Sequence, residues 1–269
     1  MSLFVGREKQ DNIRIRGTPD GSRFVFVSDM QVPLEDRKLL RTIFEDFVPD
    51  FEPAEDAEYH LFIGGDGLDN FTLSRFLPRV LARFTLADEI KMMQRYLSQW
   101  LQHFDCRHYI FGNHEDRWER ELYEGNPQLV QFARTLPEVL ELEELGFDWV
   151  PYLKHYDFEG LILTHGDTTV VHAAKKMMDN YHSSGVSGHT NRPQSFTWAA
   201  AAGGEPITWY VSGMLCRRDI GSIIKDWRRI QPWMQGFVIG EVRKGVAHVE
   251  LVRVHHGGFW AAGKWYKVG

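Results

Sequence analysis

The sequence predicts an α/β fold built in layers. Short apolar runs rich in β-branched and aromatic residues recur along the chain, as in buried strands. Segments with helical periodicity lie between the first three runs, and elements that alternate in this way pack as layers around a core. No repeat, linker or low-complexity tract calls for a domain boundary. We therefore expect one domain over residues 1–269.

Five runs carry the strand predictions. They are residues 24–28, 59–64, 107–111, 160–164 and 207–212. The clearest helix follows Leu86, because its apolar residues fall on one face at i, i+3, i+4 and i+7 spacing. These residues are Met93, Tyr96, Leu97, Trp100, Leu101 and Phe104.

Two later segments have a different character. Residues 115–145 indicate a helical insertion in which Pro127 and Pro137 separate three short helices, and such an excursion after a strand could cover a site. Residues 237–242 and 247–255 alternate apolar and polar positions around a Lys-Gly turn, as in an antiparallel hairpin. We expect this C-terminal part to form a second sheet packed on the first.

The composition excludes several classes of protein. A net charge of -6 disfavours a broad basic surface for duplex nucleic acid. The two cysteines give no disulfide framework and suit a reducing compartment. No apolar run approaches the roughly 20 residues that cross a bilayer, so we expect a cytoplasmic protein without a membrane partner.

Side chains that bind metals stand where the predicted strands end, and glycines flank them. They are Asp29, Asp66, Asn113, His165 and His189. Alone, each has an ordinary interpretation as a turn residue, a helix cap or a buried histidine. The carboxyl ends of strands in an α/β sheet meet at one edge, however, so the ordered set predicts a metal centre there.

The residue types also fit a pair of metals. Two divalent cations about 3.5–4 Å apart repel each other, and a shared carboxylate together with a bridging hydroxide offsets that repulsion. Asp66 is the candidate bridge. Such a pair polarises a phosphoryl oxygen and lowers the pKa of bound water, so no nucleophilic side chain is required.

In this order the motifs resemble those of the calcineurin-like metallophosphoesterase superfamily, whose pattern runs DxH, GDxxD, GNHE/D, H and GHxH. The chain has SDMQ, GDGLD, GNHE, THGD and GHTN over residues 29–191. The resemblance implies a four-layer α/β/β/α sandwich of two mixed sheets with a di-metal centre at one edge. The stretches SDMQVP, FGNHEDR and SGHTNRP also resemble the phage-encoded branch of the superfamily.

The resemblance also assigns ligands. One cation would be bound by Asp29, Gln31, Asp66 and Asn191. The other would be bound by Asp66, Asn113, His165 and His189. His114 would contact the substrate phosphate and protonate the leaving oxygen, with Glu115 and Asp116 orienting or hydrating it. Arg192 and Arg75 would hold the phosphate.

Two residues depart from the family pattern. Gln31 and Asn191 stand where the family usually has histidine, and both fall on the same metal. That site becomes entirely oxygen-donating, so we expect it to bind more weakly and to favour harder ions. Mn²⁺ is the expected metal at both sites, with Mg²⁺, Fe²⁺ and Zn²⁺ as alternatives.

The leading functional prediction is a phosphodiesterase that acts on nucleotide-type diesters, including 2′,3′-cyclic nucleotides, with short nucleic acid strands as a further substrate. The alternatives are a phosphomonoesterase, a catalytically weak scaffold and a structure-specific nuclease related to double-strand-break repair nucleases. The nuclease needs a local basic groove. Its candidate residues are Arg117, Arg120, Arg217, Arg218, Arg228 and Arg229.

Overall fold

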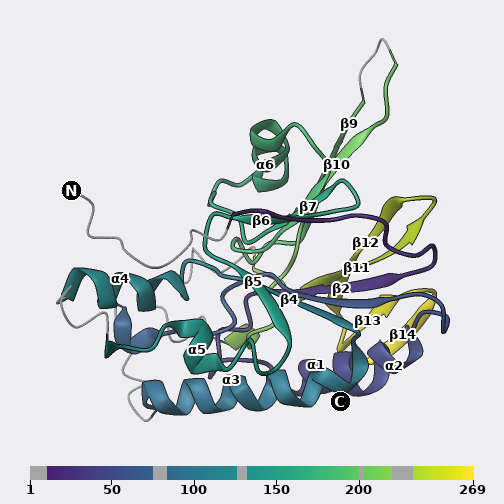
Figure 1. The fold of residues 1–269 in the computed structure, drawn as a ribbon. Coiled ribbons are helices and arrows are strands. Elements are labelled where there is room, and N and C mark those ends of the chain that lie inside the picture. Colours follow the sequence, from purple (N-terminus) through teal and green to yellow (C-terminus); the bar gives the residue numbers. More distant parts are fainter. Residues whose placement is uncertain (1–10, 75–83, 126–131, 200–202, 220–232) are drawn as a thin grey trace.

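A computed structural model describes residues 11–74, 84–125, 132–199, 203–219 and 233–269 (Figure 1). Two β-sheets form the centre of the molecule. The first has eight strands in the order β14-β13-β12-β11-β2-β3-β4-β5, and the second has six in the order β1-β6-β7-β8-β10-β9.

The strands of the eight-stranded sheet are β2 (Arg23–Val27), β3 (Tyr59–Ile63), β4 (Cys106–Ile110), β5 (Phe147–Val150), β11 (Gly236–Arg243), β12 (Val246–His255), β13 (Gly258–Ala261) and β14 (Lys264–Lys267). Those of the six-stranded sheet are β1 (Ile13–Ile15), β6 (His155–Phe158), β7 (Leu161–Thr164), β8 (Gly185–Ser187), β9 (Gln194–Trp198) and β10 (Ile207–Val211). Strands β2 to β5 run parallel, as do β7, β8 and β10. Both sheets are mixed because the remaining pairs, apart from β1 with β6, are antiparallel.

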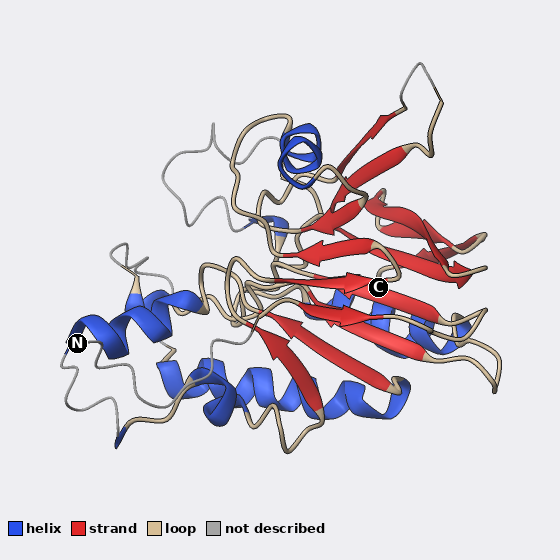
Figure 2. Ribbon diagram, turned by 45° about the horizontal axis from the view of Figure 1, so that its top comes forward, coloured by secondary structure: helices blue, strands red, loops and turns tan. Residues whose placement is uncertain are grey.

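Helices cover the outer faces of the two sheets (Figure 2). The α-helices are α1 (Arg37–Arg41), α2 (Val48–Asp50), α3 (Leu86–Trp100), α4 (Asp116–Gly125), α5 (Leu136–Leu140) and α6 (Ala173–Tyr181). A π-helical turn, η1 (Thr42–Phe47), and two 3-10 turns, η2 (Phe71–Leu73) and η4 (Leu101–His103), complete the described helical elements. Figure 1 shows α1, α2 and α3 below the eight-stranded sheet and α6 on the opposite side of the molecule.

Alternating side chains of the central strands supply two different cores. In β2, Phe24 and Phe26 pack between the sheets, whereas Val25 and Val27 pack against the helical layer. A third cluster fixes α6 on the six-stranded sheet through buried residues such as Met177. The order is helices, sheet, sheet and helix, which confirms the four-layer sandwich.

The predicted strands and the helix after Leu86 are confirmed by β2, β3, β4, β7, β10 and α3. The C-terminal hairpin also forms, but the prediction that it lies in the second sheet is wrong. Strand β11 pairs with β2 and extends the first sheet. The physical reason is that β11 is apolar on both faces: Val238 enters the core between the sheets and Phe237 the helical core.

The predicted insertion at 115–145 contains α4 and α5. Pro137 lies in the first turn of α5, after the N-cap Thr135, whereas Pro127 lies outside the described residues. None of the described helices is both long and apolar enough to span a membrane.

Candidate metal centre

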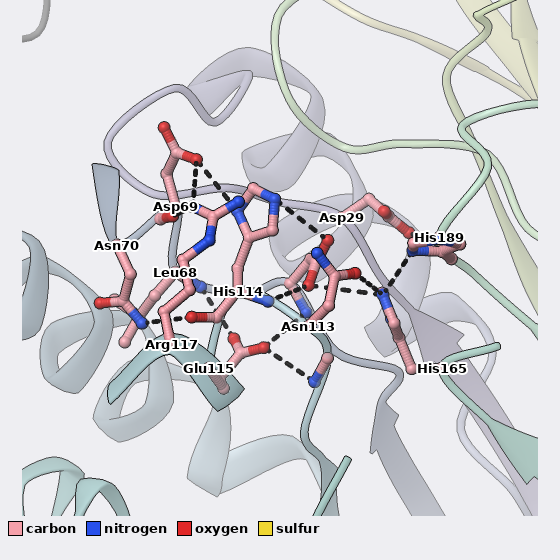
Figure 3. A network of polar contacts seen from close by, with 12 residues as sticks. Asp29, Leu68, Asp69, Asn70, Asn113, His114, Glu115, Arg117, His165 and His189 are labelled. Atoms are coloured by element: carbon pink, nitrogen blue, oxygen red, sulfur yellow. Dashed lines mark hydrogen bonds and ion pairs between the residues drawn. The ribbon is translucent and has the colours of Figure 1, made fainter. Parts of the chain in front are cut away.

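Five loops place the predicted ligands at one edge of the sandwich. The loops follow β2, β3, β4, β7 and β8. Strands β2, β3 and β4 are parallel to one another, as are β7 and β8, so the strands of each set end on the same side of their sheet. Figure 3 shows Asp29, Asn113, His165 and His189 gathered there, and a ligand atom of Asp66 lies within 4.8 Å of one from each of the two histidines. The structure therefore brings together residues that are up to 160 positions apart in the chain.

A hydrogen bond to the backbone determines which ring nitrogen of His165 faces the other ligands. Its Nδ1 lies 2.8 Å from the carbonyl oxygen of Gly64, which can only accept, so Nδ1 carries the proton. Nε2 then points at Asn113 Oδ1 (3.1 Å) and Asp66 Oδ1 (3.4 Å). A neutral imidazole would direct a lone pair at these oxygens, which is repulsive unless a cation lies between them. A backbone carbonyl behind a ligating histidine is the usual support of a metal site.

Two predicted ligands have buried oxygens that lack hydrogen-bond partners within the described part of the chain. Asp29 accepts hydrogen bonds on Oδ2 from the Ser28 hydroxyl (2.7 Å) and the His189 N–H (3.0 Å), but its Oδ1 has no partner. Asn191 Oδ1 is also buried without a partner. Buried oxygens are normally satisfied, so both fit the binding of a cation.

Five predicted ligands have positive φ angles. They are Asp29 (54°), Gln31 (50°), Asp66 (50°), His189 (70°) and Asn191 (57°). This left-handed conformation costs a residue other than glycine about 1 kcal/mol. Such strain tends to gather where function demands a side-chain direction that a relaxed backbone would not give.

Glycines allow the loops to approach one another. A Cβ on Gly112 would lie 2.2 Å from Asp66 Oδ1, and one on Gly188 would lie 2.6 Å from Asp29 Oδ2. Any side chain at either position would push a carboxylate out of place. These close approaches explain why glycine precedes both Asn113 and His189 in the motifs.

The buried charges show that the cluster lacks positive charge. Burial raises the pKa of Asp29 to about 6, although His165 opposes the rise. Burial would also raise the pKa of Asp66, but His114 and His165 outweigh it and hold that pKa well below its usual range. Asp66 in turn raises the pKa of His165 to about 10 against the effect of burial. The carboxylates thus draw a proton to the place where a metal would otherwise supply the charge.

His189 differs from its neighbour. Burial, followed by the charge of His165, lowers the pKa of His189 to about 4. A neutral imidazole is the form that binds a metal. Its Nδ1 lies 3.2 Å from His165 Nε2.

A second group of contacts surrounds His114 (Figure 3). Its Nδ1 lies 3.0 Å from Asp69 Oδ1, and its Nε2 lies 3.6 Å from Asp66 Oδ2. Arg117 donates to the carbonyl oxygen of Asp69 (2.6 Å), and Asn70 donates to that of His114 (2.8 Å). Asp69 is not among the site residues predicted from the sequence. The spacing of GDGLD, which repeats aspartate three positions after Asp66, was the signal that could have identified it.

Glu115 and Asp116 do not orient His114 in the way that the sequence suggested. Glu115 is fully buried and accepts four hydrogen bonds, from the backbone N–H groups of Asp66, Leu68 and Gly112 and from the Tyr109 hydroxyl. Asp116 pairs with Arg120. The role of Glu115 is to hold the loop after β3 to the loop after β4, so that both present their ligands together.

The remaining predicted residues make other contacts or lie outside the described residues. Arg192 donates to the carbonyl oxygens of Thr169 (2.7 Å) and Val170 (3.1 Å), so its guanidinium contacts the loop that follows His165. Gln31 contacts Asp66 through its backbone N–H (2.8 Å). Arg75 lies outside the described residues.

The chain is similar to several known proteins. The family model described as calcineurin-like phosphoesterase matches residues 22–206. The Gene 54 proteins of Mycobacterium phages L5 and D29 are each 26% identical over 262 residues, which cover 91% of this chain and 99% of theirs. Wild-type Vps29 from Entamoeba histolytica, solved in complex with zinc, covers 92% of this chain and 99% of its own at 8% identity and a TM-score of 0.42. Vps29 from Cryptosporidium parvum gives a TM-score of 0.40 at 10% identity, covering 88% of this chain and 99% of its own.

Removing the charge of Asp29 should stabilise the metal-free protein. The raised pKa, about 6 against a usual 3.8, means that ionised Asp29 opposes folding above pH 6 and that this penalty fades as the pH falls toward 4. At about pH 7.5 and in the presence of a chelator, the free energy of unfolding measured in urea should be about 2–3 kcal/mol higher for Asp29→Asn than for wild type. The difference should shrink toward pH 5; a chelated variant that is less stable than wild type at pH 7.5 would contradict this electrostatic account.

Proposed function

The chain belongs to the calcineurin-like phosphoesterase family, and we propose that it is a metal-dependent phosphodiesterase that hydrolyses nucleotide-type diesters, 2′,3′-cyclic nucleotides included. The observation that carries the proposal is the convergence of His165 Nε2 with oxygens of Asp66 and Asn113. Carboxylate, amide and imidazole donors at one point form a ligand set for divalent cations, and Asp66 and His165 are buried there while Asn113 is half-buried.

Two cations are proposed, with Mn²⁺ as the metal. Asp29, Gln31, Asp66 and Asn191 would bind one of them. Asp66, Asn113, His165 and His189 would bind the other. When bound, such a pair supplies an activated water and a positive field for the phosphoryl oxygens.

His114 is proposed as the group that protonates the leaving oxygen. Burial alone would lower its pKa, but the carboxylates of Asp66 and Asp69 outweigh burial and raise the pKa. These acidic neighbours favour the protonated imidazole, which is the form that a general acid needs. Asp69, 3.0 Å from Nδ1, acts as a positioning residue that directs Nε2 toward the site.

The surroundings favour a small nucleotide-type substrate. Tyr152 is half-buried with its ring centre 6.2 Å from that of His165, and it offers an aromatic face beside the ligands. This feature supports a substrate with a base or another flat group attached.

Three of the six arginines expected to build a nuclease groove make contacts with aspartates. Arg117 contacts Asp69, Arg120 pairs with Asp116 (3.1 Å), and Arg217 pairs with Asp219 (3.3 Å). Arg228 and Arg229 lie outside the described residues. A broad basic surface for a long strand therefore has no support in the described part of the chain.

A panel of substrates tests the proposal. Metal-free protein should be loaded with Mn²⁺, Mg²⁺ or Zn²⁺ and assayed on bis-p-nitrophenyl phosphate, 2′,3′-cyclic AMP, p-nitrophenyl phosphate and duplex DNA. We expect diesters to be hydrolysed at least about tenfold faster than the monoester, with Mn²⁺ most effective and the chelated protein inactive. Hydrolysis of the monoester with both diesters untouched would make the protein a phosphomonoesterase.

A pair of adjacent variants separates chemistry from metal binding. His114→Ala should keep its bound metal and lose about 10²–10⁴-fold in kcat, the usual contribution of a general acid. Asn113→Ala should lose turnover and also bind metal more weakly, because it removes a ligand. Metal content and kcat are measured on both; unaltered turnover in the two variants would favour a scaffold.

A further inference from the structure

A second cluster of metal-binding side chains lies at the other end of β3 and β4. Ligand atoms of Glu58, His60 and Cys106 all lie within 4.8 Å of one another. His60 and Cys106 are direct partners in the parallel register of β3 and β4, so their side chains stand next to each other on one face of the sheet. That end is the amino end of the strands, opposite the carboxyl end that carries Asp66 and Asn113.

A chain of hydrogen-bonding groups leads inward from this cluster. His60 Nε2 lies 3.0 Å from Glu58 Oε2, and His60 Nδ1 lies 3.2 Å from His108 Nε2. His108 Nδ1 lies 3.7 Å from Asp148 Oδ2, too far for a hydrogen bond, and is buried without a partner among the residues that the structure describes. Both rings are buried between the sheets, with 1% and 4% of their surface exposed.

The two histidines have fewer N–H groups than neighbours that could accept one. Three approaches link Glu58, His60, His108 and Asp148, and each would need an N–H. A neutral histidine carries one N–H, so two neutral rings serve two of the three approaches. Among the described residues, His108 Nδ1 is the nitrogen left without a partner.

We propose that Glu58, His60 and Cys106 bind a thiophilic divalent cation, Zn²⁺, and that His108 and Asp148 support that site from behind. The cation takes the place of the proton between Glu58 and His60 Nε2. The proton of His60 then sits on Nδ1 and is donated to His108 Nε2, and the proton of His108 sits on Nδ1, the nitrogen that faces Asp148. Cys106 binds as a thiolate, and its proton is released to solvent.

The donor set selects zinc over the metals proposed for the other centre. Sulfur, nitrogen and carboxylate oxygen are the ligands of tetrahedral Zn²⁺ sites, and a histidine backed by a carboxylate is a recurrent feature of them. Glu58 is 42% exposed at its side chain and Cys106 is partly exposed, so water can fill the fourth position. The site would fasten β3 to β4 and takes no part in hydrolysis.

Cobalt provides a test that is independent of the catalytic centre, because a thiolate bound to Co²⁺ gives a near-ultraviolet charge-transfer band and none of the proposed catalytic ligands is a cysteine. Cys106 and Cys216, the two cysteines of the chain, offer a matched pair of variants. Metal-free full-length wild type, Cys106→Ala and Cys216→Ala are titrated with Co²⁺. We expect the band in wild type and Cys216→Ala and its loss in Cys106→Ala, which keeps full turnover with Mn²⁺.

Thermal unfolding with and without Zn²⁺ provides a second measurement on the same proteins. Zn²⁺ should raise the Tm of wild type and Cys216→Ala more than that of Cys106→Ala, because only the first two retain this site. The proposal is overturned if wild type saturated with Co²⁺ shows no band, if the band persists in Cys106→Ala, or if it depends on Cys216 instead.

Discussion

Two carboxylates buried side by side are the constraint on which the active edge depends. Asp29 is fully buried and Asp66 is 2% exposed, and each raises the electrostatic cost of ionising the other. In a medium of low polarity, unbalanced charges of this kind would oppose folding. His114 and His165 offset part of the charge on Asp66, but Asp29 keeps an oxygen without any partner. Bound metal ions would supply the missing positive charge.

The fold makes this arrangement possible by supporting the loops from both sides. Strands from two sheets end at one edge, and the core packed between the sheets fixes the position of one set of strand ends relative to the other. Glu115 joins the loops after β3 and β4 by accepting hydrogen bonds from the backbone of both, which restricts the movement of one loop relative to the other. Packing energy from the layers then offsets the backbone strain that directs Asp29 and Asp66.

Much of this was predictable from sequence, and the exceptions share a cause. Strand ends and glycine spacing predicted the metal ligands, because the carboxyl ends of strands in an α/β sheet meet at one edge. These ligands are Asp29, Asp66, Asn113, His165 and His189. The pairing of β11 with β2 could not be predicted, since a local pattern shows that a strand is buried but does not identify its neighbour. For the same reason, the sequence could not show that Asp69 lies close to His114 or which groups Glu115 contacts, because the partners are far apart in the chain.

The β3–β4 pair illustrates how one piece of sheet can serve two kinds of site. Its carboxyl end carries oxygen-rich ligands, which suit harder ions, and its amino end carries a thiol and imidazoles, which suit zinc.

Electron paramagnetic resonance of metal-free protein titrated with Mn²⁺ tests the central claim most directly. The first ion should give an isolated signal at the intact site, and the second, weaker ion should convert it into that of an exchange-coupled pair sharing Asp66. Two ions that remain magnetically isolated, or a protein that never binds the second, would contradict a shared carboxylate between paired cations.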